Sequence, residues 1–201
     1  MKNTIKYLIL LIIYLVCGVN LQAQNYTFRN VVMSDGLSGL LVNAIYKDSE
    51  GFVWLGTDNC LDRFDGVKVR HYEFRGVDSG RKKRVNCITE TADNQLWVGN
   101  GIGLWRLNRA NGQLERIVPE KIDFAVNTLL PDGDILYIGT EKGLFIQEDG
   151  QLLQVLTDRN MLAACNRIMD LCLNEDKSAL WLATVQGLFS YSLKDGKIDS
   201  W

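Results

Sequence analysis

Residues 43–57 read NAIYKDSEGFVWLGT, and three later segments of the chain repeat the end of this stretch. WLGT at 54–57 is matched by WVGN at 97–100, YIGT at 137–140 and WLAT at 181–184. The aromatic residues that open these segments are 43, 40 and 44 residues apart. A nearly constant period of this length indicates a repeat architecture, in which each unit is one supersecondary element that packs against its neighbours.

Further positions keep the same period. Six residues after each aromatic residue comes CL at 60–61 and GL at 103–104, 143–144 and 187–188. The next place is aromatic in the later units but is Asp62 in the first, where Phe64 is shifted by two residues. Turn pairs recur as DG at 65–66, 149–150 and 195–196 and as NG at 111–112, and an asparagine precedes an apolar stretch in each unit. These asparagines are Asn43, Asn86, Asn127 and Asn166.

Each unit is predicted to form four short strands. In the first, Val42–Tyr46, Phe52–Thr57, Leu61–Phe64 and Val67–Phe74 are separated by residues that favour tight turns. Four-stranded units at this period predict an all-β fold, a β-propeller of about four blades that form a partial ring. The approximate blades are 37–80, 81–121, 122–160 and 161–201.

The repeated aromatic and glycine residues are interpreted as structural markers of the blades. The aromatic side chains are expected to fill the layer between sheets, which we favour over stacking on a ligand. The glycines are expected to let neighbouring backbone approach closely. The markers are Trp54, Gly56, Trp97, Gly99, Tyr137, Gly139, Trp181, Gly103, Gly143 and Gly187.

The first segment is predicted to be a secretory signal peptide over residues 1–23. Lys2 and Lys6 precede a mainly apolar run at 7–19, and LQA at 21–23 offers a cleavage site after Ala23. The apolar run has 13 residues, whereas a helix that crosses a bilayer needs roughly 20, which favours cleavage over an uncleaved anchor. The propeller repeats are then expected over 24–201.

Composition excludes several classes of function. Lys and Arg number 22 against 24 Asp and Glu, so the chain has no overall attraction to nucleic acid. Of the cysteines that follow the signal peptide, Cys165 and Cys172 are closest in sequence. More residues separate them than usually separate a pair of zinc ligands, so no metal is expected. Small apolar strand residues are the favoured interpretation of the four, and disulfides the alternative. The four are Cys60, Cys87, Cys165 and Cys172.

The stretch 43–57 closely resembles the two-component regulator propeller repeat, whose motif has the form N-x-I-x-x-D-x-x-G-x-x-W-x-G-T. LDRFDG at 61–66 resembles the second half of that repeat, with Cys60 where glycine is usual. FRN at 28–30 and SDGLS at 34–38 resemble the start of the periplasmic sensor region of Bacteroidota hybrid two-component systems. The resemblance covers residues 25–201.

This resemblance implies a periplasmic signal-input segment whose ligands are glycan-derived oligosaccharides. Such systems carry two seven-bladed propellers, a β-sandwich, a membrane helix that anchors them in the inner membrane, a histidine kinase and often a receiver with a DNA-binding output. With four repeats ending at Trp201, the chain is expected to be truncated. Its expected partners are the remaining blades and the kinase portion of a longer chain, and a second copy in a homodimer.

No catalytic residue and no cofactor are expected in this chain. His71 lies in the alternating stretch 67–74, where a surface or interface strand residue is favoured, and the Gly-rich segment 99–103 opens no helix that could hold phosphate. The acids at 48, 50, 58, 62 and 65 are read as turn residues without calcium-loop spacing, and RKKR at 81–84 as a solvated loop. The alternative function is a propeller enzyme resembling the streptogramin lyases, which would need a complete ring and a clustered acid–base pair.

Four blades are expected to leave two open sheet edges, which promote aggregation. Tyr26–Val32 is predicted to be an outer strand that completes another blade. Residues 24–201 are therefore expected to be marginally stable or to self-associate.

Overall fold

The computed structural model describes residues 5–7, 30–77, 83–117, 122–156 and 167–200. The chain divides into two units, Met1–Asn30 and Val31–Trp201. In the first unit, residues 5–7 form a helical turn, and the rest of the predicted signal peptide lies outside the described residues. Within the described part of the chain, no helix is both long enough and apolar enough to cross a membrane.

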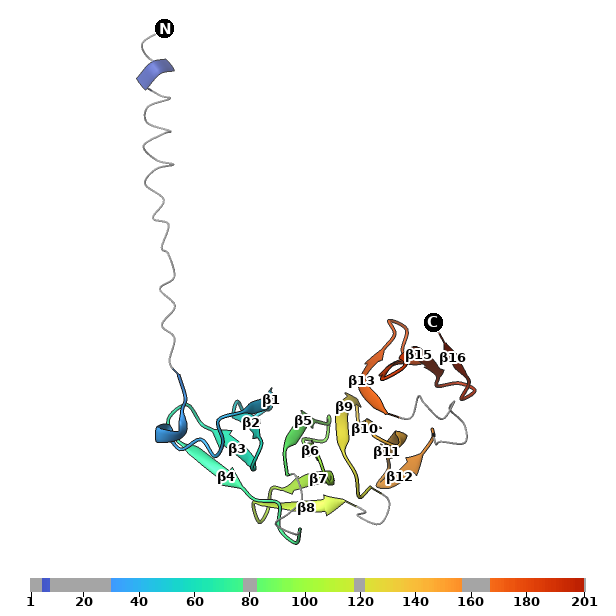
Figure 1. Cartoon of the computed structure of the whole chain (residues 1–201). Helices are drawn as coiled ribbons and strands as arrows, with labels where there is room; N and C mark the ends of the chain where they lie inside the picture. The colour runs from blue at the N-terminus through green and yellow to red at the C-terminus, as the bar shows by residue number, and fades with distance from the viewer. Residues whose placement is uncertain (1–4, 8–29, 78–82, 118–121, 157–166, 201) are drawn as a thin grey trace. The chain divides into compact units, whose positions relative to one another are not determined.

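The unit Val31–Trp201 is built from four antiparallel sheets of four strands each, which follow one another in chain order (Figure 1). A short 3-10 helix, η1 (Met33–Asp35), precedes them, and every strand pairs with the next strand of its own sheet. The prediction of four-stranded propeller blades is confirmed. The strands are β1 (Val42–Lys47), β2 (Val53–Thr57), β3 (Leu61–Phe64) and β4 (Val69–Tyr72) in sheet 1; β5 (Val85–Glu90), β6 (Leu96–Asn100), β7 (Gly103–Asn108) and β8 (Gln113–Ile117) in sheet 2; β9 (Val126–Asp132), β10 (Ile135–Thr140), β11 (Gly143–Glu148) and β12 (Gln151–Gln154) in sheet 3; and β13 (Ile168–Leu173), β14 (Ala179–Thr184), β15 (Gly187–Ser192) and β16 (Ile198–Ser200) in sheet 4.

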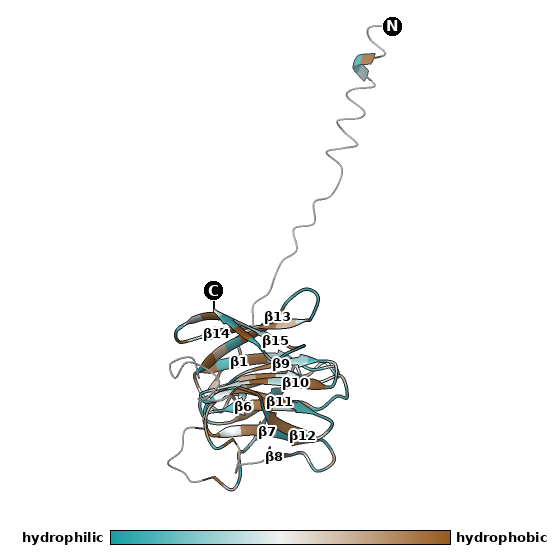
Figure 2. Ribbon diagram, turned by 90° about the vertical axis from the view of Figure 1, so that its right-hand side faces the viewer, coloured by the Kyte–Doolittle hydropathy of each residue, from teal (hydrophilic) through white to brown (hydrophobic). Residues whose placement is uncertain are grey.

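The predicted DG and NG pairs form the turns between the third and fourth strands of all four sheets. Their glycines, Gly66, Gly112, Gly150 and Gly196, have φ values of +97°, +67°, +74° and +68°. These values lie in the left-handed region, which glycine enters without a steric penalty. Figure 2 shows the result in hydropathy, with apolar residues gathered in the strands and hydrophilic residues in many of the turns.

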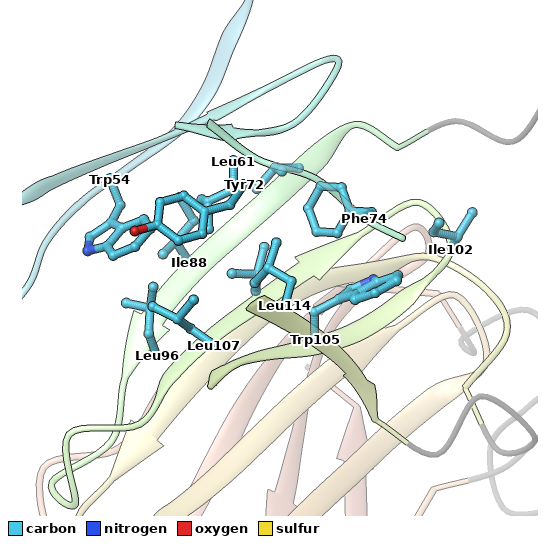
Figure 3. Close-up of a cluster of buried hydrophobic side chains, with 12 residues drawn as sticks. Trp54, Leu61, Tyr72, Phe74, Ile88, Leu96, Ile102, Trp105, Leu107 and Leu114 are labelled. Atoms are coloured by element: carbon cyan, nitrogen blue, oxygen red, sulfur yellow. The ribbon is translucent and has the colours of Figure 1, made fainter. Parts of the chain in front are cut away.

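The sheets pack face to face, and their first strands contact one another in order: β1 contacts β5, β5 contacts β9, and β9 contacts β13. Between sheets 1 and 2 lies an apolar cluster that includes Trp54 and Tyr72 from sheet 1 and Trp105 from sheet 2 (Figure 3). The ring centroids of Trp54 and Tyr72 are 5.1 Å apart, and those of Phe74 and Trp105 are 5.0 Å apart. Burial of these aromatic surfaces is a main source of stability at the interface.

The acid six residues before the tryptophan of the first repeat, Asp48, binds that tryptophan. This carboxylate accepts the backbone N–H of Phe52 at 2.8 Å and the indole N–H of Trp54 at 2.7 Å. Asp48 thus fixes both the turn into β2 and the orientation of a fully buried ring. In sheet 2 the hydroxyl of Thr91 holds the indole of Trp97 in the same way, at 3.1 Å.

The glycines of the second strands lie against the next sheet. A Cβ atom added to any of them would come within 3.0 Å of the residue that opens the next sheet's first strand, which is nearer than real Cβ atoms approach. The sequence predicted close approach of neighbouring backbone here, whereas the structure places branched side chains against the glycines. The pairs are Gly56 with Val85, Gly99 with Val126, and Gly139 with Ile168.

Sheet 4 differs from the other three in the burial of its third strand, because no described sheet covers the face that carries the repeated leucine. Leu61, Leu104 and Leu144 are fully buried, whereas the corresponding Leu188 is 44 % exposed. Ala183, at the place of the three glycines, is exposed, and Trp181 is half-buried. The second strand β14 is therefore buried on one face only, whereas β6 is buried along its whole length. The reason is that no described sheet packs on this side, as the ribbon shows at β15 and β16, at the end of the array (Figure 1).

We expect this face to drive self-association of the chain. Replacement of Leu188 by aspartate should shift the protein toward monomer, because it puts a charge into the apolar surface that a second copy would bury. Analytical ultracentrifugation over a range of concentrations measures this shift. Leu153→Asp on β12 is the matched control, since Leu153 is 56 % exposed and lies on an outer strand. Equal self-association of both variants and the wild type would contradict the expectation.

The prediction of an outer strand at Tyr26–Val32 is wrong for the residues of this segment that the structure describes. Residues 26–29 lie outside the described residues, and residues 30–32 are not in a strand.

Candidate functional site

The first strands of the four sheets surround a pocket of about 480 Å³, called here the central pocket. It is a candidate binding site because four sheets contribute to it, so one ligand placed there would contact the whole array. Its lining residues are Asn43, Arg84, Asn86, Gly101, Ala125, Asn127, Glu141, Arg167 and Met169.

The three repeated asparagines that the structure describes all line this pocket, and two of them also link adjacent sheets; the fourth, Asn166, lies outside the described residues. The side-chain amide of Asn86 donates to the carbonyl of Val126 at 2.9 Å, and that of Asn127 donates to the carbonyl of Ile168 at 2.8 Å. Asn43 has the same position in β1, but its side-chain Nδ2 is buried without a hydrogen-bond partner. A buried donor without a partner is costly, so Asn43 has an amide available for a ligand or water.

Charged groups of both signs line the same pocket. The guanidinium of Arg167 lies 3.9 Å from the carboxylate of Glu141, and both side chains are about half exposed. Arg84 precedes β5, just as Arg167 precedes β13. A guanidinium offers several donors in a plane, and a carboxylate offers only acceptors. Together with the asparagine amides, these groups suit a polar ligand that both donates and accepts hydrogen bonds.

A second cluster of polar side chains lies on the opposite face of sheet 1 from Leu61 and Tyr72. It consists of Cys60, Asp62 and His71 and is called here the Cys–Asp–His cluster. Asp62 Oδ1 is 2.7 Å from His71 Nδ1 and accepts the Cys60 thiol at 3.3 Å. Its other oxygen, Oδ2, accepts the backbone N–H of Ser38 at 2.8 Å and the Ser38 hydroxyl at 2.7 Å.

The strand register produces this cluster. Asp62 on β3 pairs directly with His71 on β4, and Cys60 is two residues before Asp62, on the same face of the sheet. Asp62 belongs to the predicted strand Leu61–Phe64, which is confirmed, so its interpretation as a turn residue is wrong: it lies inside β3 and is 0 % exposed. His71 lies on an outer strand as predicted, and its side chain is 47 % exposed.

The cluster adjoins a pocket of about 570 Å³, called here the side pocket, whose lining includes Cys60, His71, Glu73, Arg75 and Lys83. Burial raises the pKa of the Cys60 thiol to about 12; the Ser38 hydroxyl opposes the rise and the Asp62 charge adds to it. In the ligand-free protein at neutral pH this thiol is therefore protonated.

The remaining residues named in the sequence analysis lie in strands, in turns or between sheets. The aromatic markers Trp97 and Tyr137 are buried between sheets, and Gly103, Gly143 and Gly187 open third strands with positive φ. The Gly-rich segment 99–103 joins β6 to β7 and opens no helix.

The described cysteines, at 60, 87 and 172, are free thiols, and Cys165 lies outside the described residues. Burial raises the pKa of the Cys87 thiol, as it does for Cys60. Of the basic run 81–84, only Lys83 and Arg84 are described, and Arg84 is exposed.

The sequence does contain a signal for the Cys–Asp–His cluster. Reading Cys60 and Asp62 as isolated exceptions to the repeat misses that signal. Cys60 and Asp62 are the two places where the first repeat departs from the other three, which have glycine and an aromatic residue there. Trp105 packs against sheet 1, and Phe145 packs in the cluster that holds Trp97 of sheet 2. Asp62 occupies the corresponding place, but it binds Ser38, which precedes β1. Two departures on one strand face, opposite the chain's single histidine, mark a site.

Comparison with known proteins supports the propeller repeat. Residues 36–59 match the family described as two component regulator propeller, which confirms the resemblance of the first repeat. Over 79 residues the chain is 32 % identical to a histidine kinase of Formosa agariphila. The matched stretch covers 39 % of this chain and 6 % of that protein.

Solved structures with the same fold include extracellular domains of two hybrid two component systems from B. thetaiotaomicron. The first has a TM-score of 0.70 and 21 % sequence identity, and the match covers 86 % of this chain and 26 % of that one. The second has a TM-score of 0.64 and 26 % sequence identity, and the match covers 79 % of this chain and 22 % of that one. A virginiamycin B lyase from Staphylococcus aureus has a TM-score of 0.61 at 17 % identity, over 80 % of this chain and 55 % of its own, which shows a shared fold alone. The chain thus spans about a quarter of the length of the extracellular domains that it matches.

Proposed function

We propose that this chain is a ligand-binding propeller segment of the extracytoplasmic input domain of a hybrid two-component system. The proposal rests on the repeat match at residues 36–59 and on the likeness to extracellular domains of such systems. The segment then acts in the periplasm of a cell whose longer protein carries the remaining blades and the kinase portion. Its role is to bind a signal molecule and to alter the packing of the blades.

The composition of the central pocket carries the proposal of the ligand class, which is a glycan-derived oligosaccharide. Sugar hydroxyl groups are both donors and acceptors, and they occur in adjacent pairs that amide, guanidinium and carboxylate groups can bind in pairs. The pocket provides all three kinds of group: the Asn43 amide, the Arg84 and Arg167 guanidinium groups and the Glu141 carboxylate. Its volume of about 480 Å³ lies in the range of small-ligand sites.

The geometry favours binding over catalysis. The single histidine of the chain, His71, lies on the outer strand β4 and does not line the central pocket. A lyase that uses a histidine at the channel would need that residue on or near the first strands. We therefore assign no reaction to this chain, and the lyase-like alternative has only a shared fold in its favour.

Isothermal titration calorimetry with a panel of oligosaccharides from polysaccharide digestion tests the ligand class. We expect one class of oligosaccharide to bind the purified chain and Arg167→Ala to weaken that binding at least about tenfold, because hydrogen bonds to a charged group contribute about 1.5–3 kcal/mol each. Arg75→Ala is the matched control: Arg75 is an exposed arginine that lines the side pocket, so its loss should leave affinity unchanged.

Three results would overturn this assignment. Binding that is lost in Arg75→Ala and kept in Arg167→Ala would place the ligand in the side pocket. Binding of none of the oligosaccharides would refute the ligand class. Turnover of a cyclic depsipeptide or a glycan by the purified chain would refute the non-catalytic role.

A further inference from the structure

We propose that Cys60, Asp62 and His71 form a binding site for a divalent transition-metal ion of the zinc class, with the thiolate, one carboxylate oxygen and an imidazole nitrogen as its protein ligands. The three ligand atoms, one from each residue, lie within 4.8 Å of one another. This site is independent of the oligosaccharide proposal, because none of its residues lines the central pocket.

The distances place the ligand atoms close to a tetrahedral arrangement. Zinc bonds of about 2.0–2.3 Å imply that two ligand atoms of one tetrahedral ion lie roughly 3.5 Å apart. The Cys60 thiol lies 3.3 Å from Asp62 Oδ1, and His71 Nδ1 lies 2.7 Å from the same oxygen. The imidazole must therefore retreat from the carboxylate by less than about 1 Å, and the thiol and imidazole ligand atoms already lie within 4.8 Å of each other. His71 can make this movement because its side chain is half exposed on an outer strand.

Ser38 holds the carboxylate in an orientation that suits a metal ligand. Its N–H and its hydroxyl both bind Oδ2 of Asp62, so Oδ1 is the oxygen that faces Cys60 and His71. Hydrogen bonds of this kind to the non-coordinating atom of a ligand fix its position and tune metal affinity. The Ser38 hydroxyl in turn lies 3.0 Å from the hydroxyl of Thr57, which is fully buried.

The donor set selects the kind of metal. A thiolate and an imidazole favour zinc and related transition metals, whereas calcium and magnesium prefer sites made of oxygen. Three protein ligands leave a fourth position open, which in zinc proteins is filled by water or by another ligand. The side pocket provides the route of entry, since Cys60 and His71 both line it, and Glu73 on its wall adds a negative charge that attracts a cation.

Metal binding also accounts for the way in which the first repeat differs from the others. An aromatic residue at position 62 would continue the pattern of Trp105, Phe145 and Phe189, and a glycine at position 60 would continue that of Gly103. Instead a carboxylate is completely buried on this face, where Ser38, Cys60 and His71 supply its polar partners. A divalent ion would neutralise the thiolate and the carboxylate together.

Titration of the purified, reduced chain with Co²⁺, followed by absorption spectroscopy, tests the site. We expect the near-ultraviolet band of a cobalt–thiolate bond and the strong visible bands of tetrahedral cobalt, both of which Zn²⁺ should abolish and excess Mg²⁺ should leave intact. His71→Gln should weaken Co²⁺ and Zn²⁺ binding at least about 100-fold, and Ser38→Ala, which removes only the support of Asp62, about tenfold. The half-exposed His71 can be replaced with the fold intact, as circular dichroism will verify.

Cys172→Ser is the matched control, because Cys172 is an exposed free thiol on β13. It should leave the cobalt–thiolate band and the affinity unchanged, whereas Cys60→Ser should abolish the band. The proposal is overturned if the wild-type chain gives no such band, if His71→Gln binds as tightly as the wild type, or if Cys172→Ser loses the band. Oligosaccharide binding by His71→Gln should equal that of the wild type, so failure of either proposal can be recognised separately.

Discussion

Replacement of Trp54 by alanine will lower the free energy of unfolding by about 4 kcal/mol, the largest effect expected of any single substitution considered. Trp54 is 0 % exposed and packs against Tyr72 in the cluster between sheets 1 and 2. The substitution removes this buried surface, leaves a cavity, and deprives the carboxylate of Asp48 of the indole N–H that it accepts at 2.7 Å. Urea unfolding followed by circular dichroism, in the Leu188→Asp background that limits self-association, measures the change.

Trp181→Ala is the matched control, because Trp181 has the same place in the fourth repeat. Its side chain is only half-buried, since its sheet has an uncovered face, and we expect a loss of about 1 kcal/mol. Equal losses for the two tryptophans would show that Trp54 does not owe its contribution to the packing between sheets.

Replacement of Gly99 by valine is the second large effect, with an expected loss of about 3 kcal/mol from overpacking. A Cβ atom at Gly99 would lie 2.5 Å from the Cys87 sulfur and 2.6 Å from a methyl carbon of Val126. Val126 opens β9, so its clash pushes sheets 2 and 3 apart, whereas the clash with Cys87 of β5 distorts sheet 2 itself. The same urea titration in the Leu188→Asp background measures the loss.

Ala183→Val is the control for this substitution. Ala183 has the corresponding position in β14, but it is exposed, and a β-branched residue fits a strand well. We expect a change within about 0.5 kcal/mol. If Gly99→Val were as stable as the wild type, the close contact between the second strand and the next sheet would not be a determinant of packing.

Much of the fold follows from the sequence because its determinants are local and repeated. Four turn pairs with glycine at positive φ, and apolar strands between them, fix the sheets without reference to distant contacts. The first repeat shows how direct this is, since Leu61–Phe64 was predicted with its observed bounds. What lies against Gly56 could not be derived in the same way, because the identity of its neighbour, Val85, depends on how two sheets stack.

The Cys–Asp–His cluster could not be predicted from spacing alone. Its residues are separated by one and by eight positions, and this matches no metal motif that depends on a single loop or helix. Only the register between β3 and β4 places Asp62 opposite His71, and only the segment before β1 brings Ser38 to Asp62. Departures from an internal repeat are thus more informative here than the repeat itself.

The stacking of sheets through their first strands makes this array effectively one-dimensional. In such arrays the stability is approximately the sum of what each unit contributes alone and what each pair of neighbours contributes at its interface. Sheets 2 and 3 each share two interfaces with described neighbours, whereas sheets 1 and 4 share one each. Cooperativity is therefore graded along the chain, so that opening begins by fraying at the two end sheets and reaches the middle sheets last. A ligand bound across the first strands would tighten the whole array by coupling its end units to its middle units.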